Sequence, residues 1–175
     1  MSARRTGNLL GALACAVVER VDGELRSHPN QNSTWLGALN LIACFDGCSN
    51  QQLAAALGLS HPATVRLVDK LEAAGLVEGH PGHDRRAVAL HLTPAGHRHL
   101  GETLTRRADL LEQIVAGLNP GQRTALDTAT STLLHTLTDS PLTGAHLCRF
   151  CDERSCPQDH CPVHQRAVEL ARTRR

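Results

Sequence analysis

The chain has 175 residues and a formal net charge of +1, with 41% hydrophobic and 20% charged residues. This length and composition favour one globular domain with its own core. No apolar run approaches the ~20 residues that span a bilayer. The acidic Glu19 and Asp22 follow too soon after the basic start for a signal peptide, so we expect a cytoplasmic protein. Because the net charge is close to zero, affinity for nucleic acid has to come from local clusters of the 17 arginines.

Two helices are predicted in the first quarter of the chain. Leu9, Leu13 and Val17 form an apolar stripe at helical spacing, which predicts a helix over residues 8–26. A His-Pro-Asn break follows at residues 28–30. A second apolar pattern predicts a helix over residues 34–45, which Asp46-Gly47 ends.

Residues 49–71 carry the signals of two short helices joined by a tight turn. Ser49 and Gln52 have the spacing of a capping box, so a helix should begin there and end at Gly58. Ser60 is the expected N-cap of the next helix, with Pro62 in its first turn. Two helices in this arrangement predict a helix-turn-helix.

The second helix of this pair has two different faces. The side chains expected to face the core recur at i, i+3, i+4 and i+7: they are Thr64, Leu67, Val68 and Leu71. The opposite face presents His61, Val65, Arg66 and Asp69, with Lys70 alongside. Taken alone, such a charged face is typical of a solvated helix.

The pattern then changes to a β-hairpin followed by long helices. Residues 76–78 and 88–92 predict two short strands, joined by a basic loop rich in glycine and proline. Thr93-Pro94 and Asn119-Pro120 are N-cap and N1 pairs, and they predict helices to about residues 116 and 138. A last short helix is predicted over residues 163–172.

Taken together, these segments resemble the MarR family of winged helix-turn-helix regulators. The resemblance rests on residues 51–60 and 66–77, on Asp84-Arg85-Arg86 in the hairpin, and on Leu92-Thr93-Pro94-Ala95-Gly96 after it. It covers about residues 8–138 and implies a mainly α fold with a small β-hairpin, in which terminal helices form a homodimer. The expected division is an N-terminal dimerisation helix (1–30), a winged helix-turn-helix lobe (31–93), dimerisation helices (94–140) and a cysteine-rich metal-binding tail (141–175).

The resemblance also implies how the chain binds double-stranded DNA. His61, Val65 and Arg66 lie where a recognition helix reads base edges in the major groove, and an arginine can bridge N7 and O6 of guanine. Ser60 and nearby N–H groups suit a phosphate, and Lys70 lies on the same face. The family's wing enters the minor groove, here through Arg85 or Arg86, with Asp84 orienting Arg86. A two-fold dimer implies a pseudo-palindromic operator, and family members often act as repressors.

The family also often binds small effectors between its dimerisation helices and its DNA-binding lobe. Here Trp35, His28 and Leu39 are candidate residues of such a pocket.

Four cysteines in the tail lie within fourteen residues, with the spacing C-x2-C-x4-C-x4-C. They are Cys148, Cys151, Cys156 and Cys161, called the cysteine cluster below. Four thiolates can hold one zinc ion tetrahedrally or an iron–sulfur cluster, and spacing alone does not choose between them. A thiol/disulfide switch is a third possibility. His146, His160 and His164 flank the cluster and are expected to face solvent or to support its ligands rather than bind the metal.

The other three cysteines, Cys15, Cys44 and Cys48, are expected to be small core residues. Two other classes of function are open alternatives to a DNA-binding regulator. One is a metal-dependent enzyme, but four cysteine ligands leave no open coordination position, and the chain has no HExxH motif or phosphate-binding glycine loop. The other is a winged-helix module that binds proteins, which the arginines of the wing disfavour.

Overall fold

A computed structural model describes residues 2–27, 32–82 and 88–173 of the chain. Its elements, in order, are α1 (Ala3–Arg26), α2 (Ser33–Cys44), α3 (Asn50–Leu57), α4 (His61–Ala73), β1 (Val77–Pro81), β2 (Val88–Leu92), α5 (Pro94–Val115), α6 (Pro120–Leu137), α7 (Pro141–Cys148) and α8 (Pro162–Thr173). A 3₁₀ turn, Gln158–His160, precedes α8. The expected mainly helical fold with one small hairpin is confirmed.

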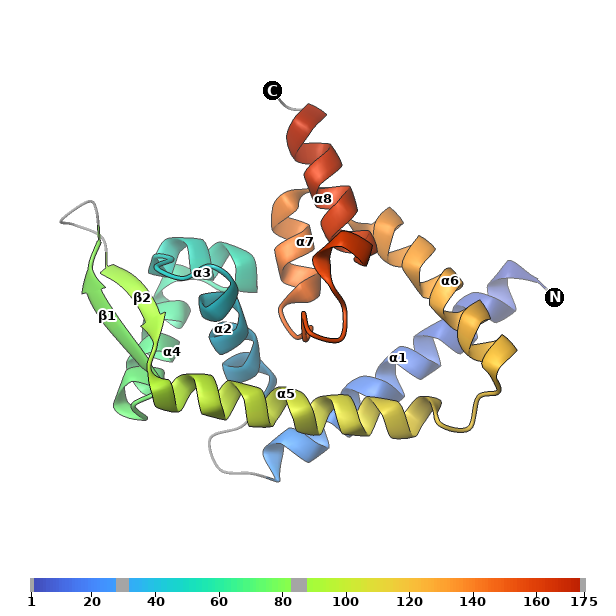
Figure 1. Cartoon of the computed structure of the whole chain (residues 1–175), viewed down its shortest axis with the longest axis horizontal. Helices are drawn as coiled ribbons and strands as arrows, with labels where there is room; N and C mark the ends of the chain where they lie inside the picture. The colour runs from blue at the N-terminus through green and yellow to red at the C-terminus, as the bar shows by residue number, and fades with distance from the viewer. Residues whose placement is uncertain (1, 28–31, 83–87, 174–175) are drawn as a thin grey trace.

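The long helix α5 connects the two halves of the molecule (Figure 1). At its N-terminal end, α2, α3, α4 and the hairpin form a lobe, and at the other end the chain turns back into α6. Helix α1 crosses α5, while α7 and α8 lie between the lobe and α6 and contact α3 and α6 respectively. The tail therefore bridges the lobe and the terminal helices.

Capping side chains fix most of the helix starts. Ser49 and Gln52 form the predicted capping box of α3, and Asn119 forms a second one with Gln122 at the start of α6. Thr93 accepts a hydrogen bond from the N–H of Gly96 at the start of α5. These local signals place the predicted helices within one or two residues of the observed ones, except at the start of α1.

Three local predictions need correction. Helix α1 begins five residues earlier than predicted, because Ser2 caps it by accepting a hydrogen bond from the N–H of Arg5. Strand β1 begins at Val77 and runs to Pro81 rather than spanning residues 76–78. Helix α7 was not predicted, although Ser140-Pro141 repeats the cap-and-proline pattern used for α5 and α6.

The core of the described chain lies in the lobe and where the lobe meets α5. Ile42 of α2, Leu71 of α4 and Leu90 of β2 are fully buried there, and Leu25 is the one residue of α1 in this core. The hairpin pairs antiparallel in the register Val77↔Leu92 to Pro81↔Val88. An isolated bridge between Cys48 and Leu90 attaches it to the segment after α2.

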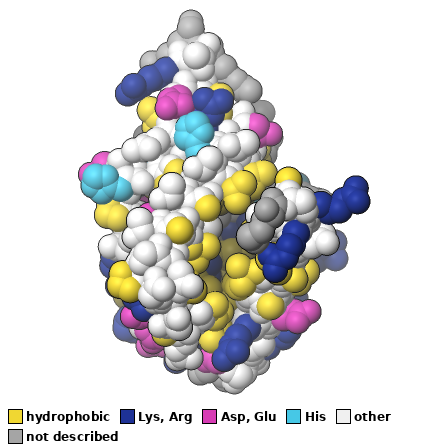
Figure 2. Space-filling model, turned by 90° about the vertical axis from the view of Figure 1, so that its right-hand side faces the viewer, with side chains coloured by type: hydrophobic (Ala, Val, Ile, Leu, Met, Phe, Trp, Pro, Cys, Tyr) yellow, Lys and Arg dark blue, Asp and Glu magenta, His cyan; other side chains and the backbone are white. Residues whose placement is uncertain are grey.

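Helices α1 and α6 bury little of themselves within one chain. Helix α6 has no buried residue among those described, and both helices expose large apolar side chains: Leu9, Leu10, Leu13 and Val18 on α1, and Leu133, Leu134 and Leu137 on α6. Figure 2 shows hydrophobic side chains gathered around a hollow on the side of the molecule where these helices lie. In water such faces favour burial against another surface.

Candidate functional site

Helix α4 presents one face to the core and the other to solvent, as predicted. Thr64, Leu67, Val68 and Leu71 are buried, whereas His61, Arg66 and Lys70 are exposed and Val65 is half-buried. Gly58, with φ at +69°, makes the turn from α3 into α4 in a conformation that glycine adopts without strain. The structure therefore brings the predicted base-reading side chains together on one open helix face.

The start of α4 has polar groups that the helix itself does not use. Ser60 occupies the N-cap position, but its hydroxyl makes no capping hydrogen bond, so the prediction of a side-chain cap there is wrong. Its side chain is exposed beside the first-turn N–H groups. Arg66 Nε donates to the Pro62 carbonyl at 3.3 Å, so the guanidinium lies along this same turn. The Ser60 hydroxyl, the first-turn N–H groups and the Arg66 guanidinium are all hydrogen-bond donors suited to an anion such as phosphate.

The hairpin beside α4 is tied to the end of α2. Asp46 Oδ1 lies 2.7 Å from His91 Nδ1 on β2, and the Gly47 N–H donates to the Leu90 carbonyl at 3.0 Å. The three predicted wing residues, Asp84, Arg85 and Arg86, lie outside the described residues, as does His28. The structure therefore places the strands of the wing and leaves the predicted roles of the wing residues as predictions.

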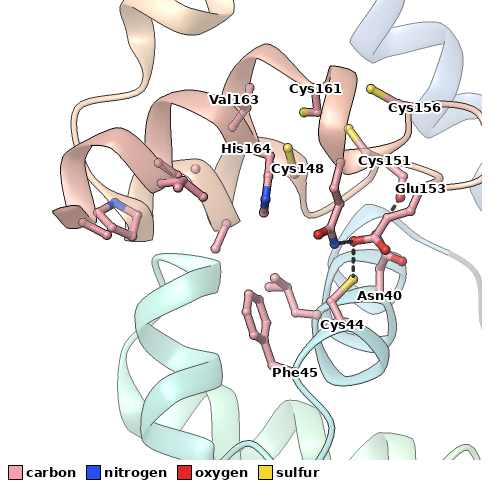
Figure 3. A pocket seen from close by; sticks show the side chains of 18 residues that line it. Asn40, Cys44, Phe45, Cys148, Cys151, Glu153, Cys156, Cys161, Val163 and His164 are labelled. Carbon is pink, nitrogen blue, oxygen red and sulfur yellow. Dashed lines mark hydrogen bonds between the residues drawn. The ribbon is translucent and has the colours of Figure 1, made fainter.

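The cysteine cluster lines a pocket of about 410 Å³ between α2, α7 and α8. Figure 3 shows its four thiols on one side, with Cys44, Asn40 and Phe45 of the α2 region opposite. Glu153 and His164 also line the pocket. Residues thirteen positions apart in the sequence are thus brought to one place by the turn between α7 and α8.

The thiols of the cluster lie near enough to one another to shift each other's pKa. The hydrogen bond from Cys148 lowers the pKa of Cys151 to about 7 and raises that of Cys148. Burial, with the nearby charge of Cys161, raises the pKa of Cys156 to about 11. Of Cys148, Cys151 and Cys156, Cys151 therefore most readily becomes a thiolate.

The thiols line a wall of the pocket rather than surround a point. In the described part of the chain, no three histidine, cysteine or acidic side chains meet around a common centre as a metal ion would require. All seven cysteines are free thiols.

The other three cysteines do not share one environment. Cys48 is buried, as expected, and burial raises its pKa to about 11. The expectation of a core position is wrong for Cys15 and Cys44, which are exposed. Cys15 lies on the open face of α1, and Cys44 ends α2 at the pocket, where its thiol donates to Glu153 at 3.7 Å. Partial loss of hydration of the thiol at the pocket wall, together with Glu153, raises the pKa of Cys44 to about 11.

Residues that no sequence pattern singled out attach the tail to the lobe. The buried Asn40 of α2 donates through Nδ2 to the carbonyls of Arg149 (3.2 Å) and Cys151 (2.9 Å). His146 Nδ1 lies 3.0 Å from the Ala56 carbonyl of α3. The sequence signal for this contact was an asparagine in an apolar helix, because a buried amide needs hydrogen-bond partners. No local pattern could identify those partners, because Arg149 and Cys151 lie more than 100 positions from Asn40 in the chain.

The helix pair α3–α4, with its exposed face, and the hairpin β1–β2 beside it define a winged helix-turn-helix protein. Residues 32–87 match the model of the MarR family. The transcriptional repressor MprA of Escherichia coli K12 is 34% identical over 87 residues, a match that spans 49% of each chain. The aligned part is thus about half the length of this curated relative. Residues 32–87 therefore resemble the winged helix-turn-helix domain of the MarR family.

Solved structures show that the likeness of fold extends beyond the matched domain. A MarR family protein from Bacillus stearothermophilus superposes with a TM-score of 0.69 at 21% identity, covering 79% of this chain and 99% of that one. FabT of Streptococcus pneumoniae, solved in complex with DNA, gives 0.68 at 19% identity with the same coverage. MprA is named as a transcriptional repressor, and the Bacillus stearothermophilus protein as a MarR family protein. No helix in the described ranges is long and apolar enough to cross a bilayer.

Proposed function

We propose that this chain is a cytoplasmic transcriptional repressor that binds a pseudo-palindromic operator in double-stranded DNA as a homodimer. The observation that carries the proposal is the exposed face at the start of α4, where His61 and Arg66 stand opposite a buried apolar face. A helix of this width fits the major groove of B-DNA with its N-terminal residues at the base edges. The DNA-bound state of FabT and the repressor name of MprA support the same reading.

The roles of the individual side chains follow from their chemistry. Arg66 is the candidate for guanine and Val65 for a thymine methyl group, with His61 beside them. Ser60 and Lys70 are suited to phosphates, which fix the position of the helix without reading sequence. Arg85 and Arg86, oriented by Asp84, are proposed to reach the minor groove.

The homodimer is supported by the faces that one chain leaves open. The exposed leucines of α1 and α6 form apolar surfaces at the end of the molecule away from the hairpin (Figures 1 and 2). A second copy that covers them would place two α4 helices in one two-fold symmetric particle. Half-sites about one helical turn, or ~10 base pairs, apart are then expected.

The tail belongs to this proposal as its candidate control element. Its cysteine cluster is proposed to hold a metal, as zinc or as an iron–sulfur centre, in a structural or sensing role. A small-molecule effector is proposed to occupy the apolar part of the pocket beside Phe45; the predicted effector residues Trp35 and Leu39 do not line this pocket.

Selection from a pool of duplexes with a randomised centre tests the function. We expect enrichment of an inverted repeat and an affinity for the enriched duplex that falls steeply as salt rises, because binding releases counterions from phosphates. Enrichment of no sequence, together with salt-independent or absent binding, would favour a protein-binding winged-helix module instead.

A further inference from the structure

The tail, residues 141–173, holds α2 through one buried amide. Asn40 is 6% exposed and lies among buried apolar residues of α2. Its Nδ2 group donates two hydrogen bonds, both to backbone carbonyls of the tail, those of Arg149 and Cys151. An apolar replacement would leave these two carbonyls without their partner, which is costlier than losing an exposed hydrogen bond. Asn40 is therefore a specific fastening point between two segments that are far apart in the sequence.

Only a few further contacts join the tail to the lobe around this point. The ring of Phe150 lies against Gly37 of α2, where an added Cβ would be 3.0 Å from a ring carbon. The guanidinium carbon of Arg149 is 4.3 Å from the centre of the same ring. His146 Nδ1 reaches the Ala56 carbonyl of α3. The pocket of about 410 Å³ separates α2 from much of α7 and α8, so these few contacts hold the tail to α2 and α3.

The other end of the tail is packed on α6. Thr138, directly after α6, is buried. Gly144 of α7 lies between this threonine and α8, since an added Cβ would be 3.7 Å from Thr138 Cγ2 and 3.2 Å from Ala167 Cβ. His135 Nε2 of α6 is 3.7 Å from Glu169 Oε2 of α8. Helices α6, α7 and α8 thus form one packed unit.

Two separate connections therefore join α6 to the DNA-binding lobe. One is α5, which runs from the hairpin to the turn before α6, and the other is the tail, which lies between the lobe and α6 (Figure 1). A lobe attached through one helix can hinge at the ends of that helix, whereas a second attachment at a distance restricts the hinge. Helix α2 packs on α3 and α3 on α4, so this restriction extends to the DNA-reading face.

We propose that the tail is a brace that fixes the lobe relative to α6 and thereby sets the half-site spacing that the dimer accepts in DNA. Asn40 is the positioning residue of this brace: it acts through the tail and contacts no DNA itself. The fastening of the tail stands on the contacts above, and its effect on half-site spacing rests on the proposed function. Because both ends of the brace are built by one chain, each protomer carries its own.

Hydrogen exchange of the full-length protein, followed by mass spectrometry, tests the fastening. Asn40→Ala should speed exchange of the backbone N–H groups of α7 and α8 by about 5- to 30-fold, the effect expected when one or two hydrogen bonds are lost. Phe150→Ala, at a half-buried ring, should act in the same direction. Leu71→Val is the control, because it destabilises the core of the lobe at a fully buried position on α4 and should leave this difference between helices unchanged. Unchanged exchange of α7 and α8 in both tail variants overturns the brace.

The positioning role is tested with duplexes that carry the enriched half-sites at altered spacing. Two added base pairs turn one half-site by about 70° around the DNA axis, since one turn takes about 10.5 base pairs. The wild-type protein should discriminate against these duplexes. The ratio of its affinities for original and altered spacing should fall at least about fivefold in Asn40→Ala and Phe150→Ala, the lower end of the usual coupling between two sites. Leu71→Val should keep the wild-type ratio, because a loss of stability alone does not change the accepted spacing.

The outcomes separate the brace from the proposed function. An unchanged ratio in both tail variants, together with faster exchange of α7 and α8, overturns the positioning role of Asn40. Absence of wild-type binding to every duplex contradicts the proposed function, and the positioning role falls with it. The exchange measurement then still decides whether Asn40 fastens the tail, because it needs no DNA.

Discussion

Gly96, in the first turn of α5, lies directly against the backbone of Leu76, the residue before β1. A Cβ on Gly96 would overlap the Leu76 carbonyl oxygen and lie 3.0 Å from its carbonyl carbon. Thr93 strengthens this junction, because its N–H donates to the same Leu76 carbonyl at 3.1 Å and its hydroxyl to that of Gly75 at 2.6 Å. The base of the wing is thus joined to α5 at one point where only glycine fits.

Gly96→Ala should therefore destabilise the protein. The added methyl group has backbone rather than a flexible side chain in its way, so one of the two segments has to shift, at a cost of about 1–3 kcal/mol. Urea denaturation measures the free energy of unfolding. Gly101→Ala, one and a half turns further along α5 with no atom within 4 Å of its Cβ, is the control. It should stabilise the helix by about 0.5–1 kcal/mol, and equal effects at both positions would contradict the close contact.

The serines at the starts of α3 and α4 should respond differently to replacement by alanine. Ser49 accepts a hydrogen bond from the Gln52 N–H within a capping box, and its loss should cost about 1 kcal/mol of stability. Ser60 makes no capping bond, so Ser60→Ala should change stability by less than about 0.5 kcal/mol.

For DNA binding, replacing Ser60 should have the larger effect and replacing Ser49 the smaller one. Ser60→Ala should weaken binding to the enriched duplex roughly tenfold, since a hydrogen bond to a charged phosphate is lost. Ser49→Ala should bind normally at temperatures where it is folded. Thermal denaturation and fluorescence anisotropy on the same samples measure both properties. A stability loss at Ser60 as large as at Ser49 would show that its hydroxyl caps the helix in solution.

Signals within a few residues of one another predicted most of the fold. The N-caps at Ser49, Thr93 and Asn119 each satisfy N–H groups three residues away, so the sequence alone contains both partners. The buried and exposed faces of α4 follow from its periodicity for the same reason. Helix α7 was not predicted, although Ser140-Pro141 carries the same local signal for the start of a helix.

The parts that could not be predicted depend on contacts between distant residues. The pairing of Asn40 with the Cys151 carbonyl joins positions 111 apart, and no periodicity encodes it. The exposure of Cys15 could not be predicted for a similar reason. Its apolar neighbours in the sequence do not reveal that this face of α1 stays uncovered within one chain. The cysteine cluster was predicted as a group, whereas its place against α2 came only from the structure.

The open faces of α1 and α6 predict the effect of a charge on assembly. Leu137 on α6 is 62% exposed, and Leu137→Glu should convert the proposed dimer to a monomer, because burying an unpaired carboxylate is strongly unfavourable. Leu142→Glu on α7, at a side chain 50% exposed, is the control and should leave the dimer intact. Sedimentation velocity measures the outcome. A wild-type protein that sediments as a monomer at all concentrations would exclude the homodimer, and with it the two-fold operator.

Arg66 is the residue whose loss should most directly change sequence recognition. Its exposed guanidinium lies in the first turns of α4, and replacing an arginine that bridges N7 and O6 of guanine costs about 1–3 kcal/mol of binding free energy. Arg66→Ala should therefore weaken binding and also relax the preference at one base pair of each half-site. Arg20→Ala removes the same charge from an exposed position on α1 and should alter neither. If Arg66→Ala lowers affinity equally for all duplexes, the Arg66 side chain contacts phosphate rather than a base. His61, Val65 and the wing would then be the residues that recognise the base sequence.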